Sequence, residues 1–239
     1  MKPKFRLYFP GNLEEGKSFK LEKKQSHYLK NVVRLKSGDK ISLFNSENGE
    51  WDSIIISHLK DSTEIKVKKM SISKKKDNNL WLAFSPIKKI NQDMMLQKTT
   101  ELGVQKFLPV LCERSVVREI NIERAEKVVI EATEQSNRIS VPKISKIQKL
   151  NNFLEKFAND GNIIFCDINS TLLTIDKKLS KEKPTCILIG PEGDFSETER
   201  KLITGHKKVL SFSLSHNILR SETAAIAATT ILSFKLNFN

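Results

Sequence analysis

Residues 185–199, Thr185-Cys-Ile-Leu-Ile-Gly-Pro-Glu-Gly-Asp-Phe-Ser-Glu-Thr-Glu199, decide the fold. The apolar run at their start predicts a buried strand, and Ser196-x-x-Glu199 predicts a capping box that begins a helix. Between them, Gly190 and Gly193 lack a Cβ, so the backbone can approach a ligand and adopt positive φ. Loops that follow parallel strands bind ligands in open α/β sheets. The stretch therefore predicts either a ligand-binding loop or a plain tight turn.

The chain around this stretch, from residue 80 to residue 239, alternates apolar runs with helical patterns. Such alternation predicts an α/β domain whose mostly parallel sheet is covered on both faces. The expected strands are Leu80–Phe84, Lys106–Leu111, Ile163–Cys166, Thr185–Ile189 and Val209–Ser213, and the expected helices are Asn91–Leu102, Ile122–Arg138, Glu197–Gly205 and Glu222–Phe234.

The N-terminal third has a different pattern, with short strand-like runs separated by turn residues such as Asn48-Gly49. It predicts a small all-β barrel over residues 1–73, and the polar stretch at residues 74–79 predicts a linker. The expected elements are strands at Lys4–Phe9, Ser18–Leu21, Lys40–Phe44, Trp51–Ser57 and Glu64–Ser71, and a helix at Lys24–Val33.

The formal net charge of the chain is +13. Residues 1–76 hold 18 basic and 9 acidic residues, a net charge of +9, so most of the excess lies in the N-terminal third. This favours an anionic partner such as RNA, although a lysine-rich genome would give the same excess. No apolar run is long enough to span a bilayer and no signal peptide precedes the first strand, so we expect a soluble cytoplasmic protein.

Several classes of site have no support in the sequence. The three cysteines are far apart, which argues against disulfides and against a zinc site, and no other metal motif occurs. Neither G-x-G-x-x-G nor G-x-x-x-x-G-K-[ST] is present, which weakens dinucleotide and nucleoside-triphosphate functions. We therefore expect no metal in the site.

Two further motifs carry charged residues beside helix ends. In the segment 217–228, Ser221 is a suitable N-cap and Glu222 suits the first turn of a helix, where it would stabilise the helix dipole. Arg220, directly before this helix, has no such simple explanation. Glu134 and Arg138 lie four residues apart on one helix face, and a surface ion pair is the simplest interpretation of that spacing.

Further motifs occur along nearly the whole chain, in a fixed order. They are Arg6–Phe9, His27 with Val32–Asp39, Lys88-Lys89, Asp93–Val104, Pro109, Glu113–Ser115, Glu131–Arg138, Val141-Pro142, Gly190–Gly193 and Ile218–Ala224. Together these motifs resemble the bacterial 16S ribosomal RNA uridine-N3 methyltransferase (RsmE) family of the SPOUT superfamily. The chain departs from the family pattern at Asp194, at Asn137 and at Ser215-His216, which stand where glycine is common.

The resemblance implies a SPOUT α/β domain with a deep trefoil knot, a PUA-like RNA-binding barrel, and a homodimer that binds S-adenosylmethionine and acts on 16S ribosomal RNA, within the small ribosomal subunit. The implied cofactor-binding residues are Ile189, Gly190, Pro191, Glu192, Gly193, Leu214, Ser215, Ile218 and Leu219. The implied RNA-binding residues are Arg6, His27, Arg34, Lys88, Lys89, Arg114 and Gln135.

Methylation of uridine N3 requires loss of the N3 proton and stabilisation of negative charge on the base. Arg220 or Arg138 suits the charge-stabilising role, and Glu134 or Glu222 suits the proton acceptor. The target base must be unstacked, because N3 is occupied in a base pair. The alternatives are a ribose 2′-O-methyltransferase of the same superfamily and a non-catalytic RNA-binding or ribosome-assembly factor.

Overall fold

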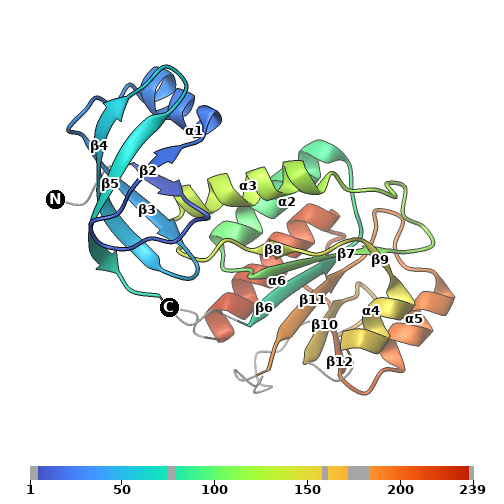
Figure 1. Ribbon diagram of the computed structural model, residues 1–239. Coiled ribbons are helices and arrows are strands. Elements are labelled where there is room, and N and C mark those ends of the chain that lie inside the picture. The colour runs from blue at the N-terminus through green and yellow to red at the C-terminus, as the bar shows by residue number, and fades with distance from the viewer. Residues whose placement is uncertain (1–4, 75–78, 158–160, 172–182, 237–239) are drawn as a thin grey trace. The chain divides into compact units, whose positions relative to one another are not determined.

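The computed structural model describes residues 5–74, 79–157, 161–171 and 183–236. The chain divides into two compact units, each described by itself below (Figure 1). Unit 1 comprises Met1–Lys76 and Thr133–Val141, and unit 2 comprises Asp77–Ala132 and Pro142–Asn239. The predicted linker at residues 74–79 falls mainly outside the described residues. The segment Thr133–Val141, distant in sequence, packs with the N-terminal third.

Unit 1 is built on one sheet with the order β1-β3-β4-β5-β2, in which β1 pairs with β3 in parallel and the other pairs are antiparallel. Leucine, isoleucine and valine side chains of alternate strand positions fill its core. Among the described strands no pairing joins β1 to β2, so the predicted closure into a barrel is not confirmed. The strands are β1 Arg6–Tyr8, β2 Ser18–Leu21, β3 Lys40–Asn45, β4 Gly49–His58 and β5 Thr63–Ile72.

The helix predicted at Lys24–Val33 is two short pieces. An α-helical turn, α1 (Lys23–His27), is followed by one turn of π-helix, Tyr28–Val32. Val33 N–H donates to the carbonyl of Tyr28 at 2.9 Å, the i to i+5 spacing of a π-turn. Arg34 then adopts a φ of 60°, and this left-handed residue ends the helical segment.

Arg6 makes a set of buried polar contacts that joins separate segments of unit 1. Its Nε and Nη2 donate to Glu50 Oε2 at 3.1 and 2.9 Å, and the two side chains are only 9% and 6% exposed. Its guanidinium also donates to the carbonyls of Thr133, Glu134 and Arg138, which lie at the end of helix α3. Carbonyls at a helix C-terminus favour a cation. Arg6 was predicted to bind RNA, but its buried guanidinium has a structural role instead.

Unit 2 contains a sheet in which every described pairing is parallel, with the order β12-β10-β11-β6-β7-β8 and β9 paired to β7. This confirms the α/β class. The strands are β6 Leu80–Phe84, β7 Lys106–Leu111, β8 Lys143–Ile144, β9 Gln148–Lys149, β10 Asn162–Cys166, β11 Thr185–Ile189 and β12 Val209–Phe212. The helices are α2 Lys89–Glu101, α3 Ile122–Gln135 (of which residues 133–135 belong to unit 1), α4 Leu150–Phe157, α5 Glu197–Thr204 and α6 Ser221–Lys235.

Helices cover both faces of this sheet, with α4 and α5 on one side and α2 and α6 on the other (Figure 1). Phe153 and Phe157 of α4 pack with Phe165 and Leu188 of the sheet in one apolar core. Because successive strand residues face opposite sides, both faces of β10 and β11 are apolar. This double burial explains why those strands are continuous apolar runs in the sequence.

Some elements of unit 2 differ from the prediction. Helix α3 ends at Gln135 rather than at Arg138, because Asn137 adopts a φ of 58° that an α-helix cannot contain. Helix α4 was not predicted, although its buried residues recur at helical spacing. Strands β8 and β9 have two residues each and carry no readable pattern. Among the described residues no helix has the length and apolar character that a membrane span requires.

The Arg6 contacts predict a large effect of substitution on stability. Arg6→Ala leaves the Glu50 carboxylate buried without its cation, so the free energy of unfolding should fall by about 3 kcal/mol. Lys20→Ala, at an exposed position of strand β2, is the matched control and should change it by less than about 0.5 kcal/mol. Urea denaturation of the full chain measures both. Equal, small effects would contradict a structural role for Arg6.

Candidate active site

A cavity of about 550 Å³ lies where four neighbouring parallel strands end. The segments that follow β6, β10, β11 and β12 all contribute to its wall, because carboxyl ends of parallel strands meet at one edge of a sheet. A volume of this size is typical of cavities that bind small molecules. The lining residues are Lys88, Asn91, Cys166, Asp167, Ile168, Ile189, Gly190, Pro191, Glu192, Asp194, Phe195, Ser213, Leu214, Ser215, Asn217, Ile218, Leu219, Arg220, Ser221, Glu222 and Ala224.

The loop after β11 is shaped by a tight packing contact. A Cβ on Gly190 would lie 2.6 Å from the ring of Phe195, which is itself buried against Phe165. Gly193 has more room, since the nearest atom to its Cβ would be 3.4 Å away. The sequence suggested positive φ at these glycines, but neither has it, and the left-handed residue of the loop is Asp194 with a φ of 59°. Only Gly190 is sterically required here.

The helix that follows this loop begins as predicted. Ser196 Oγ accepts from Glu199 N–H at 3.2 Å, and Glu199 Oε2 accepts from Ser196 N–H at 3.0 Å, so the capping box is confirmed. The other oxygen of Glu199 accepts from the backbone N–H of Glu113. Glu199 therefore joins the start of α5 to the segment after β7.

The N-terminus of α6 brings charged and polar groups into the cavity. Arg220 is the N-cap residue, not Ser221 as predicted, and the Ser221 hydroxyl instead donates to the carbonyl of Gly190 at 3.1 Å. Glu222 lies in the first helical turn and is 4% exposed, whereas Arg220 is exposed. The first turn of a helix stabilises negative charge. A carboxylate and a guanidinium therefore lie in the same cavity as the glycine loop.

The segment after β10 also reaches the cavity, and the sequence analysis did not single it out. Asp167 is buried, and its Oδ1 accepts from Asn169 N–H at 3.0 Å while its Oδ2 accepts from Ser170 Oγ at 3.1 Å. Burial raises the pKa of the neighbouring Cys166 thiol to about 12, so this thiol is protonated at neutral pH. The sequence could have indicated Asp167 as a site residue, because it is a polar residue directly after a buried strand.

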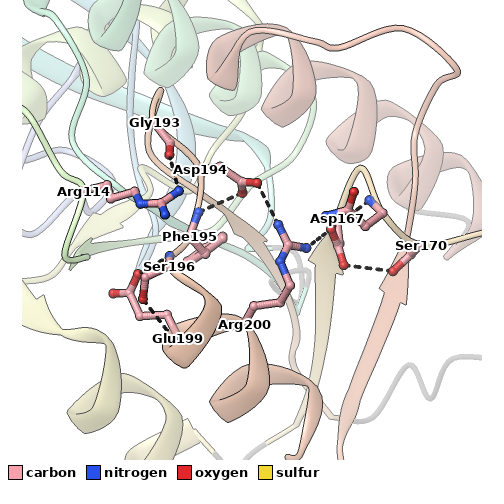
Figure 2. Close-up of polar contacts among 10 residues, drawn as sticks. Arg114, Asp167, Ser170, Gly193, Asp194, Phe195, Ser196, Glu199 and Arg200 are labelled. Carbon is pink, nitrogen blue, oxygen red and sulfur yellow. Dashed lines mark hydrogen bonds and ion pairs between the residues drawn. The ribbon is translucent and has the colours of Figure 1, made fainter.

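Arg200 of helix α5 links this segment to the loop after β11 (Figure 2). Its Nη1 donates to Asp167 Oδ1, and its Nη2 donates to Asp194 Oδ2 at 2.7 Å. Burial alone would raise the pKa of Asp167, but the hydrogen bond and charge of Arg200 outweigh it and lower that pKa. Arg200 carried no motif in the sequence, because its partners are found only after folding.

The predicted site residues separate into groups. All predicted cofactor-binding residues except Gly193 line the cavity, together with Arg220, Glu222 and Lys88. Glu134 and Arg138 belong to unit 1, where Glu134 Oε1 accepts from Tyr8 N–H at 2.9 Å. The other predicted RNA-binding residues apart from Arg6 are exposed, namely His27, Arg34, Lys89, Arg114 and Gln135.

Comparison with known proteins identifies the family. Residues 74–233 match the model of an RNA methyltransferase domain, and residues 21–68 match that of an RNA methyltransferase PUA domain. Ribosomal RNA small subunit methyltransferase E of Rickettsia conorii is 35% identical over 228 residues, which cover 93% of this chain and 92% of that protein. The chain belongs to the ribosomal RNA small subunit methyltransferase E family. It is an RNA methyltransferase, as the sequence predicted.

Solved structures of related proteins support the same assignment. The family member from Neisseria gonorrhoeae, determined with S-adenosylmethionine bound, has a TM-score of 0.88 and 28% identity, and the match covers 96% of this chain and 97% of that one. A protein from Legionella pneumophila, also determined in complex with this cofactor, has a TM-score of 0.84 and 26% identity, and the match covers 96% of this chain and 97% of that one. The α/β fold and the PUA-like domain are thus shared with the family.

The steric difference between the two glycines predicts unequal effects of alanine. Gly190→Ala forces Phe195 to move within a packed core and should lower the free energy of unfolding by about 1–3 kcal/mol. Gly193→Ala meets only ordinary contacts and should change it by less than about 0.5 kcal/mol. Urea denaturation compares the two variants. A larger loss for Gly193→Ala would refute this description of the loop.

Proposed function

We propose that the enzyme methylates N3 of a uridine in 16S ribosomal RNA of the small subunit. Its cofactor is S-adenosylmethionine, in agreement with the relatives that contain it. The observation that carries the proposal is that Arg220 and Glu222 line the same cavity as the Gly190 loop. The charged groups that would act on the uridine base and the loop that would hold the methyl donor therefore lie at the same edge of the sheet.

The residues around the cavity suit the cofactor. Side chains of Ile189, Leu214 and Leu219 provide an apolar wall, and Gly190 packs against Phe195 with no space for a side chain between them. The segments 189–195 and 213–219 would hold the cofactor. When bound, S-adenosylmethionine supplies an electrophilic methyl group to the reaction. The chain's own residues must then prepare and orient the nucleophile.

Glu222 is the proposed proton acceptor for the N3–H group. It is buried in the cavity, and the positive end of α6 stabilises its carboxylate. The sequence left Glu134 as an alternative, but that carboxylate accepts from Tyr8 N–H in unit 1. As Glu222 takes the proton, the N3 lone pair becomes available for the methyl group.

Arg220 is the proposed stabiliser of the negative charge that spreads onto the base oxygens. Arg220 is exposed and lies at the N-terminus of α6, whose own dipole adds to the positive potential. Arg138, the sequence alternative, belongs to unit 1 and does not line the cavity. Arg220 is therefore the preferred residue for this role.

The remaining parts of the proposal concern binding and assembly. RNA contacts are assigned to the exposed residues His27, Arg34, Lys88, Lys89, Arg114 and Gln135, since phosphates attract such basic and polar groups. A homodimer is also proposed, and the exposed apolar side chains of Ile90 and Phe234, each 82% exposed, are available for such an association. We also propose the family's knotted topology, domain limits at 1–73 and 80–239, and a cytoplasmic location.

Methylation assays with small ribosomal subunits test this function. Arg220→Ala should lower kcat by about 100-fold or more with little change in cofactor affinity, because the guanidinium acts on the charged base. Arg118→Ala, at an exposed arginine outside the cavity, is the control and should retain wild-type turnover. Mass spectrometry of digested RNA should find N3-methyluridine. A ribose 2′-O-methylated nucleoside, or full turnover by Arg220→Ala, would overturn the proposal.

A further inference from the structure

We propose that Arg200, which does not line the cavity, is a positioning residue that fixes two loops of the methyl-donor site relative to each other. The inference rests on the proposed function, because it assumes that this cavity holds the cofactor. It adds a residue from helix α5 that acts on cofactor affinity through Asp167 and Asp194.

The guanidinium of Arg200 lies between the two loops, as Figure 2 shows. It is 13% exposed and forms ion pairs with Asp167, which follows β10, and with Asp194, which follows β11. Its Cζ also lies 5.9 Å from the centre of the Phe165 ring at the end of β10. Two carboxylates from two loops therefore share one planar cation, an arrangement that lysine cannot reproduce.

Each of these carboxylates also organises its own loop. Asp167 accepts from Asn169 N–H and Ser170 Oγ, and Asp194 Oδ1 accepts from Phe195 N–H at 2.7 Å. Asp194 and Asp167 both line the cavity. A shift of Arg200 would therefore be transmitted to the cavity wall without loss of any lining side chain.

Two other contacts connect the segment after β12 to the segments after β10 and β11. Ser213 N–H donates to the carbonyl of Thr171 at 2.8 Å, which joins the segments after β12 and β10. The hydroxyl of Ser221 joins α6 to Gly190, as described above. With the Arg200 contacts, the segments after β10, β11 and β12 are linked pairwise around the cavity. Arg200 supplies the link between the first two.

The backbone at Asp194 gives the Arg200 contact a further role. A non-glycine residue at a φ of 59° lies in the left-handed region and is strained. Asp194 accepts hydrogen bonds from Phe195 N–H and from Arg200 Nη2, and these two bonds offset that strain and select this conformation of the loop. Without Arg200, the loop is free to relax, and cofactor binding must then order it at a cost in affinity.

Binding measurements on the full chain test the positioning role. Arg200→Ala should raise the Kd and the KM for S-adenosylmethionine about tenfold, because the loops are no longer pre-organised. Its kcat at saturating cofactor should stay within about twofold of wild type, since Arg220 and Glu222 are unchanged. Arg124→Ala removes an exposed ion pair with Asp93 of the same unit and should change none of these values.

A double-mutant cycle shows whether Arg200 acts through the loop. Asp194→Gly removes the carboxylate but leaves the positive φ accessible, and it should raise the Kd for S-adenosylmethionine about threefold. The double variant Arg200→Ala/Asp194→Gly should bind the cofactor no more weakly than Arg200→Ala alone. If Arg200→Ala does not fold, Arg200→Lys tests the positioning role in its place. Lysine keeps the positive charge but can pair with only one of the two carboxylates, so the Kd for S-adenosylmethionine should rise about threefold.

The outcomes separate the inference from the function on which it rests. If wild-type protein does not bind S-adenosylmethionine, the proposed function fails. If wild type binds and folded Arg200→Ala, or folded Arg200→Lys in its place, binds with the same Kd, the positioning role is overturned. A fall in kcat without a change in KM would also overturn it. Independent, additive effects of Asp194→Gly and Arg200→Ala would contradict the link between the two loops.

Discussion

The parallel alignment of β12, β10, β11 and β6 is the constraint on which the site depends. Parallel hydrogen bonding brings the carboxyl ends of these strands to one edge, so four segments that are far apart in sequence form one cavity. Both faces of β10 and β11 are apolar and are covered by helices, so the loops of the site begin at buried strand ends.

The charged groups around this edge occupy separate places. Arg200 does not line the cavity and donates to one carboxylate in each of two loops, whereas Arg220 and Glu222 line the cavity at the start of α6. In unit 1, Arg6 pairs with buried Glu50 and with carbonyls at the end of α3. An arginine in a basic protein is therefore not by itself evidence of RNA contact, and burial distinguishes the structural arginines from the exposed ones.

The sequence predicted the parallel strands well, because their apolar runs are bounded by clear turn residues; Leu80–Phe84 and Thr185–Ile189 match to the residue. It predicted most of the cavity wall through the Gly190 loop and the start of α6. It missed Asp167 and Arg200, because their pairing depends on tertiary contacts over 33 residues. Arg6 was misassigned for the same reason, since its partner Glu50 and the α3 carbonyls have no sequence signature.

If the enzyme binds S-adenosylmethionine as proposed, the segments after β11 and β12 hold the cofactor, and the segment after β10 lines the same cavity. Hydrogen-exchange mass spectrometry of the full chain, with and without S-adenosylmethionine, tests this placement. Peptides that cover residues 166–171, 189–196 and 213–222 should exchange more slowly when the cofactor is present. Unchanged exchange in all three peptides, or protection confined to a separate cavity of unit 2 that Asn121 and Arg124 line, would contradict this placement.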